Sequence, residues 1–143
     1  MTNINFTVLL VEDSKHDQRF VRRAWEKNNI TNPLDVVTNG QECLAYLHQE
    51  GKYVNKPRPG IVLMDIRMPV MDGIEALQAI RADQDLKHMP VIMLTTSQED
   101  ADLIKSYDLG CNSFVQKPVD FDGLAEAVRA IHAFWTLSKL PPT

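Results

Sequence analysis

The chain has 143 residues, of which 44% are hydrophobic and 24% charged, as in an ordinary soluble globular protein. Its formal net charge of −4 argues against broad affinity for nucleic acid or for an anionic membrane. No apolar run approaches the ~20 residues of a membrane span, and the N-terminus lacks the basic segment of a secretory signal. Two cysteines, Cys43 and Cys111, do not make a disulfide framework or a metal-ligand cluster. We therefore expect a reduced, cytoplasmic protein of one domain.

Short apolar runs alternate with helical patterns along the whole chain. In order, the predicted elements are a strand at 8–11, a helix at about 14–29, a strand at 34–38, a short helix after 39–40, a loop at 51–60, a strand at 61–64, a helix opened by 72–73, a strand at 90–95, a helix at about 99–109, a strand at 113–116 and a final helix from about 121. Strands that alternate with helices predict a parallel sheet covered on both faces. Such sheets bind ligands outside the carboxyl ends of their strands.

Polar side chains stand where the apolar runs end. Glu12 and Asp13 follow the first run, Asp65 follows the third, Thr95 ends the fourth, and Lys117 follows the fifth. Three carboxylates brought together repel one another, so the cluster needs a cation or takes up protons. Oxygen ligands without sulfur or nitrogen suit Mg²⁺, which favours a phosphate partner. The simpler alternative is that the first two acids only start a helix and the third lies in a turn.

The nucleophile and the anion-binding groups of this predicted site have distinct chemistry. A lysine and a hydroxyl beside the acids could hold the oxygens of a phosphoryl group. An aspartate near Mg²⁺ can attack phosphorus and form an aspartyl phosphate. The pattern therefore predicts phosphoryl transfer at the sheet edge.

Four motifs, "LLVEDS", "VLMDIRMPVMDG", "VIMLTTS" and "FVQKP", occur in an order and spacing that resemble the receiver domain of two-component response regulators. The resemblance covers nearly the whole chain. It implies a flavodoxin-like doubly wound (βα)5 α/β fold, with a parallel five-stranded sheet in the order 2-1-3-4-5. It also implies a single receiver domain over 1–143, whose C-terminal helix from about 121 to 143 serves packing or dimerisation.

The resemblance assigns roles by position. Asp65 corresponds to the phosphoacceptor, and Mg²⁺ is expected on Glu12, Asp13, Asp65 and the backbone carbonyl of Arg67. The remaining implied roles are the switch hydroxyl at Thr95, the phosphoryl-binding lysine at Lys117, the switch aromatic at Phe114 and a cis bond before Pro118. The implied activity is signalling: a histidine kinase donates phosphate to Asp65, and the chain catalyses only its own phosphorylation and dephosphorylation. The stimulus and the downstream protein are not indicated.

Two other functions fit parts of the pattern. A Mg²⁺-dependent hydrolase of the haloacid dehalogenase type also forms an aspartyl phosphate, but it places a second aspartate two residues after the nucleophile, where this chain has Arg67. A constitutive binding module would lack one of the key residues, and all are present. Arg67 and Ser97 also occupy positions that tune the phosphoryl lifetime in this family, so that lifetime is left open.

The final helix carries a wide apolar arc. Leu124, Val128, Ile131 and Trp135 form one stripe that can cover the sheet, whereas the neighbouring arc contains Ala127, Ala130, Phe134 and Leu137. This arc either packs on another helix of the same chain or makes a two-fold homodimer. "HAFWTLSKLPP" and the enlarged loop "GKYVNKPRPG" also resemble the receivers that partner bacteriophytochrome kinases. The basic face of the first helix is either a solvated surface or a docking site for such a kinase.

Overall fold

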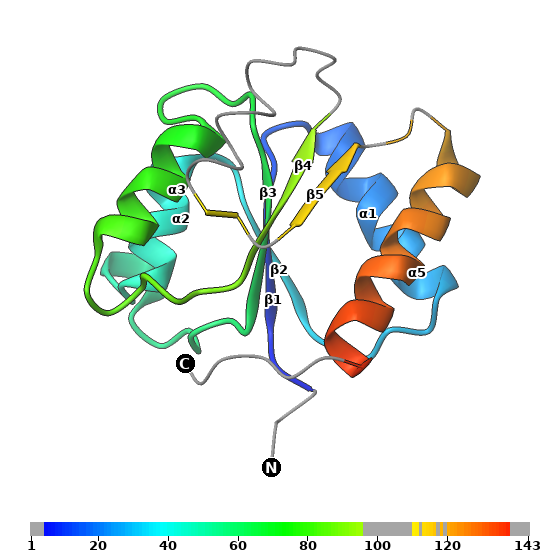
Figure 1. The fold of residues 1–143 in the computed structure, drawn as a ribbon, viewed down its shortest axis with the longest axis horizontal. Helices are drawn as coiled ribbons and strands as arrows, with labels where there is room; N and C mark the ends of the chain where they lie inside the picture. Colours follow the sequence, from blue (N-terminus) through cyan, green and yellow to red (C-terminus); the bar gives the residue numbers. More distant parts are fainter. Residues whose placement is uncertain (1–4, 96–109, 112, 117, 119, 138–143) are drawn as a thin grey trace.

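A computed structural model describes residues 5–95, 110–111, 113–116, 118 and 120–137, with the backbone alone at 95, 113, 114, 116 and 137. Its five strands form one parallel sheet (Figure 1). The strands are β1 (Val8–Val11), β2 (Leu34–Val37), β3 (Ile61–Asp65), β4 (Val91–Thr95) and β5 (Ser113–Gln116). Their spatial order, β2-β1-β3-β4-β5, confirms the predicted order 2-1-3-4-5.

Helices cover both faces of the sheet. The described helices are α1 (Lys15–Lys27), α2 (Gly40–Leu47), α3 (Gly73–Ala82) and α5 (Phe121–Leu137). Figure 1 shows α2 and α3 on one face and α1 and α5 on the other. The first three of these helices begin after a residue whose side chain accepts a backbone N–H of the first turn: Ser14, Asn39 and Asp72. The helix predicted at 99–109 lies outside the described residues.

The central strands are apolar on both sides because each face packs against helices. Along β1, Leu9 and Val11 join the core beneath α2 and α3, whereas Val8 and Leu10 join the core beneath α1 and α5. All four side chains are at most 1% exposed. This alternation is the two-residue period of a strand, and double coverage explains why the run carries no polar residue.

The sheet-facing stripe of α5 is buried, as predicted. Its members are Leu124, Val128, Ile131 and Trp135. The Trp135 ring lies 5.6 Å from the ring of Trp25 and 5.8 Å from that of Phe6, measured between centroids. Asn28, at the end of α1, donates hydrogen bonds of 2.9 Å to the carbonyls of Ala24 and Ala125. These contacts fix α5 against α1.

The segment predicted as a loop at 51–60 contains a short 3₁₀ helix, η1 (Gly51–Tyr53). Tyr53 donates a 2.5 Å hydrogen bond to Glu42 of α2, and Tyr46 donates one of 2.5 Å to Asp35 of β2. The first bond holds the connection against α2, and the second holds α2 against the edge strand β2. None of the described helices has the length and apolarity that a bilayer crossing requires.

Candidate functional site

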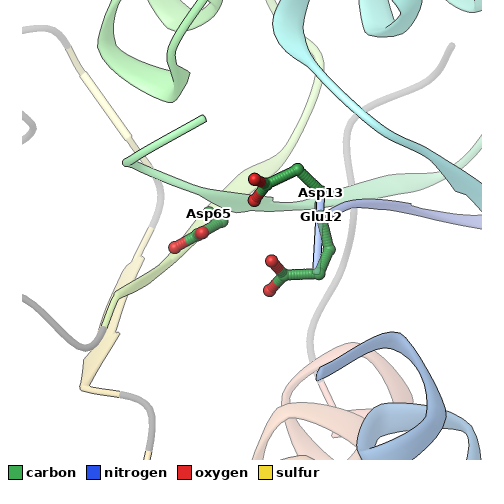
Figure 2. A group of neighbouring side chains, drawn as sticks. All are labelled: Glu12, Asp13 and Asp65. Atoms are coloured by element: carbon green, nitrogen blue, oxygen red, sulfur yellow. The ribbon is translucent and has the colours of Figure 1, made fainter. Parts of the chain in front are cut away.

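Three carboxylates from two neighbouring strands meet at the carboxyl edge of the sheet. Asp65 is the last residue of β3, and Glu12 and Asp13 directly follow β1. One carboxylate oxygen from each lies within 4.8 Å of the other two, and Figure 2 shows the three groups around one space. The structure therefore brings together the three acids that the sequence analysis selected, because β1 and β3 are adjacent in the sheet.

The three acids differ in their exposure to solvent. Glu12 is only 1% exposed, Asp65 is half-buried, and Asp13 is exposed. The Glu12 amide donates to the Val37 carbonyl at 2.9 Å, which extends the pairing of β1 with β2 by one residue. Its Oε2 accepts the amide of Ser14 at 3.2 Å, and its carbonyl accepts Nε2 of Gln18 at 2.7 Å. These hydrogen bonds hold both the backbone and the carboxylate of Glu12, so the carboxylate is oriented before any ligand binds.

The donor set fits a hard divalent cation. Carboxylates within 4.8 Å of one another repel, and the repulsion is strongest for a group as buried as Glu12. A cation of charge +2 relieves this repulsion, and three carboxylate oxygens without sulfur or imidazole favour Mg²⁺, Mn²⁺ or Ca²⁺ over softer metals. The exposed side at Asp13 leaves an approach for water and a further ligand. The residues present therefore fit a metal ion.

The connection from β3 to α3 holds Asp65 in place. Oδ1 of Asp65 accepts the amide of Ile66 at 3.0 Å, and the amide of Gly73 donates to the Ile66 carbonyl at 2.8 Å. Asp72 then starts α3 through a capping box with Glu75, in which each side chain binds the other's backbone N–H. The loop is closed at its base, so the carboxylate stands on a fixed backbone.

The tip of this connection is a strained turn. The amide of Met71 donates to the Pro69 carbonyl at 2.8 Å, and Val70 between them has φ = 71°. A γ-turn with this sign of φ is rare, and the left-handed region costs a β-branched residue about 1–3 kcal/mol. The Met71 carbonyl in turn accepts the amide of Gly40, at the start of α2, at 2.8 Å. A Cβ at Gly40 would lie 2.8 Å from Cγ of Met71, so a side chain there would disrupt this contact.

The remaining predicted site residues are only partly described. Arg67 is exposed, and its carbonyl as a metal ligand stays a prediction. The backbone of Thr95 ends β4 opposite Gln116, the residue before Lys117. The side chains of Thr95 and Phe114, Lys117 itself and the bond between Lys117 and Pro118 lie outside the described residues.

The proposed dimer arc is likewise partly described. Ala130 is exposed, Ala127 is half-buried, and the Leu137 side chain lies outside the described residues. Phe134 is half-buried and packs against the core between the sheet and the helices α1 and α5. Part of this ring is therefore covered within the chain, and the remainder faces outward.

Several residues that support the site were not selected from the sequence. Ser14 orients Glu12, Gly40 holds the β3–α3 turn, and Gly73 allows α3 to start against Asp65. Asn39-Gly40 and Asp72-Gly73 each mark a helix start in the sequence, which is the only signal they give. The second contact of Gly40, with Met71, joins segments 31 residues apart, and that of Gly73 reaches back eight residues to Asp65, so neither has a local pattern.

The fold and the site together define the class of protein. The sheet has the order 2-1-3-4-5, and its adjacent parallel strands β1 and β3 bring three acids to one edge. The model of the response regulator receiver domain family matches residues 8–129, and the chain belongs to this family. Receiver domains take part in phosphorylation-based signalling with a histidine kinase and bind a divalent metal ion. The acidic pocket is consistent with a Mg²⁺-dependent phosphoacceptor site.

Individual relatives and solved structures match most of the chain. The chain is 40% identical to the response regulator Rcp1 of Synechocystis sp. over 128 residues, which cover 90% of this chain and 87% of Rcp1. It is similar to the solved structure of the phosphorylated cyanobacterial phytochrome response regulator RcpA, with a TM-score of 0.87, 40% identity and coverage of 96% and 99%. The Mn²⁺-bound form of Rcp1 matches with a TM-score of 0.88, 38% identity and coverage of 96% and 99%.

Proposed function

We propose that Asp65 accepts a phosphoryl group from the phosphohistidine of a histidine kinase in a Mg²⁺-dependent reaction. The observation that carries this proposal is the convergence of the Glu12, Asp13 and Asp65 carboxylates within 4.8 Å at the sheet edge. These three residues, with the backbone carbonyl of Arg67, would hold the metal. When bound, Mg²⁺ neutralises negative charge that develops on the phosphoryl oxygens.

Asp65 and Lys117 then have defined parts in the transfer. An oxygen of Asp65 attacks phosphorus in line, a P–O bond forms, and the P–N bond of the phosphohistidine breaks as the imidazole leaves. Lys117 pairs with the phosphoryl oxygens. The pairing of Gln116, the residue before Lys117, with Thr95 at the same edge of the sheet supports this role. The chain turns over no metabolite and promotes only its own phosphorylation and dephosphorylation.

The phosphorylated state would change the surface formed by the segment 99–109, β5 and α5. Thr95 donates a hydrogen bond to the new phosphoryl group, and Phe114 turns inward to fill the space it leaves. One charge-assisted hydrogen bond contributes roughly 1.5–3 kcal/mol. Moving an equilibrium from 1:99 to 99:1 requires about 5.5 kcal/mol. The switch therefore depends on Lys117 and on repacking together with Thr95, and a downstream protein reads the result.

The similarity to Rcp1 and RcpA supports a kinase of the phytochrome class as the donor. The basic face of α1 supports a protein partner beside the site. On this face Arg22 donates to the Leu34 carbonyl and Arg23 lies over the Phe121 ring. Lys15 and Arg19 are exposed and have no partner among the described residues. Lys15 and Arg19 follow Asp13 by two and six residues, in the first turns of α1, and are available for the acidic groups of a docking helix.

The reaction is tested by intact mass after incubation with acetyl phosphate and Mg²⁺. Wild type should gain one phosphoryl group, and Asp65→Asn should gain none. Asp85→Asn, which removes an exposed carboxylate outside the cluster, serves as the control and should be modified like wild type. A mass gain in Asp65→Asn, or none in wild type, contradicts the proposal. Release of phosphate from unrelated phosphate esters would instead favour a hydrolase, which Arg67 disfavours.

A second part of the proposal is a two-fold homodimer through the outer arc of α5. An aromatic anchor among small side chains suits a self-complementary patch, and Phe134 lies beside the exposed Ala130. In sedimentation, Phe134→Asp should have half the mass of wild type. Val54→Asp, a change at an exposed valine outside α5, should sediment like wild type. Equal mass for wild type and Phe134→Asp contradicts the dimer.

A further inference from the structure

Val70 combines two features that are unfavourable for folding. Its φ of 71° lies in the left-handed region, which glycine or asparagine adopts readily and valine rarely does. Its side chain is 74% exposed, more than that of the other exposed large hydrophobic residue in the described part of the chain, Val54 at 61%. The valine thus neither fits its backbone nor contributes to the core. Strain of this kind is found at functional sites.

The turn that carries Val70 is held firmly on both sides. Met71 closes the turn through its amide and binds Gly40 of α2 through its carbonyl, both at 2.8 Å. The Met71 side chain packs against the core beneath α2 and α3. Val70 is therefore presented outward from a fixed backbone, so a partner that contacts it does not have to order the turn.

The position of Val70 limits which partner can use it. It follows Asp65 by five residues, which span at most about 18 Å of extended chain. An α-helix rises about 1.5 Å per residue, so about twelve of its residues span the same distance. A helix that delivers a group to Asp65 therefore comes within reach of Val70. The outer arc of α5, by contrast, belongs to another layer of the fold.

We propose that Val70 is a docking contact for the protein that phosphorylates Asp65. The partner's complementary group is an apolar side chain on the helix that presents the phosphohistidine. Covering the exposed valine then favours the complex, and the choice of valine over glycine at a left-handed position serves recognition of the donor. This inference rests on the proposed function and adds a residue that discriminates a protein donor from a small one.

The experiment compares Val70→Ala with Val54→Ala, a second exposed valine with ordinary backbone angles, in the connection that enters β3 from the opposite end of the sheet. Two donors are used: acetyl phosphate with Mg²⁺, and a phosphorylated phytochrome-class histidine kinase chosen because it phosphorylates the wild-type chain. Val70→Ala removes two methyl groups, so the ratio of the kinase rate to the acetyl phosphate rate should fall about five- to tenfold. Val54→Ala should leave this ratio unchanged.

Four results overturn the inference. An unchanged ratio in Val70→Ala, or an equal fall in Val54→Ala, shows that the valine does not recognise the donor. A change in sedimentation of Val70→Ala assigns the contact to a second copy of the chain. A lower thermal midpoint of Val70→Gly than of wild type shows that the valine serves folding. If acetyl phosphate does not modify wild type and no kinase of this class phosphorylates it, the proposed function itself is refuted, which separates the two failures.

Discussion

The backbone of Gly73 passes so close to the carbonyl oxygen of Asp65 that a Cβ atom on residue 73 would lie 2.2 Å from it. The Gly73 amide also donates to the neighbouring Ile66 carbonyl at 2.8 Å. Helix α3 therefore begins directly against the residue that carries the central carboxylate. The position of that carboxylate depends on the absence of a side chain eight residues later.

Gly73→Ala tests this dependence. Both atoms in the expected clash are close to the backbone, so neither can rotate away, and the substitution should lower the free energy of unfolding by about 3 kcal/mol. Urea denaturation measures the loss. Gly51→Ala is the control: its φ of 57° is strained for alanine, but a Cβ there meets nothing within 4 Å, so the expected cost is only about 1 kcal/mol. Equal losses in the two variants would show that the 2.2 Å approach relaxes freely.

Removal of one carboxylate should stabilise the metal-free protein. Two unit charges 4.8 Å apart repel by about 0.9 kcal/mol even in water, and Asp65 has two such neighbours. Asp65→Asn should therefore raise stability by about 1–2 kcal/mol in EDTA, which corresponds to roughly 3–7 °C in thermal midpoint. Mg²⁺ should raise the thermal midpoint of wild type more than that of Asp65→Asn, because folded wild type keeps all three carboxylates and binds the ion more tightly than the folded variant does.

Asp85→Asn provides the matched control for this experiment. Asp85 is exposed and outside the acidic cluster, so its midpoint should follow wild type with and without Mg²⁺. A midpoint of Asp65→Asn below that of wild type in EDTA would mean that hydrogen bonds of this carboxylate outweigh the repulsion. The cluster would then not be a site that needs a cation.

The rim of the sheet could be predicted from the sequence because apolar runs and the acids that follow them are local signals. The sequence indicated that the third strand ends at Met64, whereas the structure includes Asp65, which is paired with Leu94 of β4. It gave no reason to separate Glu12 from Asp13. Glu12 is buried and Asp13 exposed because the chain turns from β1 into α1 between them, and that geometry depends on the packing of α1.

Features set by distant contacts or by backbone conformation could not be predicted. Nothing in the pattern around Val70 indicates a left-handed residue, since valine is among the residues that avoid it. The hydrogen bond of Tyr46 to Asp35 joins a helix to an edge strand and depends on how the two elements pack. Such pairings depend on the fold, and no local sequence pattern indicates them.

The two buried tryptophans should contribute differently to the free energy of unfolding. The indole N–H of Trp25 donates to the Asn32 carbonyl at 2.8 Å, whereas Nε1 of Trp135 has no partner among the described residues. Both side chains are at most 6% exposed, so replacement by phenylalanine removes a similar apolar volume. Trp25→Phe also removes this buried hydrogen bond and should cost about 1 kcal/mol more than Trp135→Phe. Denaturation followed by circular dichroism measures both, and a larger loss in Trp135→Phe would contradict the assignment.

The buried thiol of Cys43 should make the protein sensitive to alkali. Burial raises the pKa of Cys43 to about 12, whereas an exposed thiol has a pKa of about 8.5. Below the lower value both states hold the proton, and the stabilising effect is complete. As the pH rises toward the higher value, only the unfolded chain releases the proton, so stability falls by up to about 1.4 kcal/mol per pH unit.

The window from pH 9 to 10 isolates the effect of Cys43, because the buried tyrosines contribute mainly at higher pH. An unfolded tyrosine has a pKa near 10, and burial and hydrogen bonds to carboxylates raise the pKa of Tyr46 and Tyr53 above that value in the folded protein. In this window the unfolding free energy of Cys43→Ala should fall less steeply with pH than that of wild type, by about 1 kcal/mol per pH unit. Cys111→Ala should change the slope less, since burial raises the pKa of this half-buried thiol but a backbone hydrogen bond and the nearby Arg81 oppose the rise. Identical slopes for wild type and Cys43→Ala would show that the thiol reaches solvent.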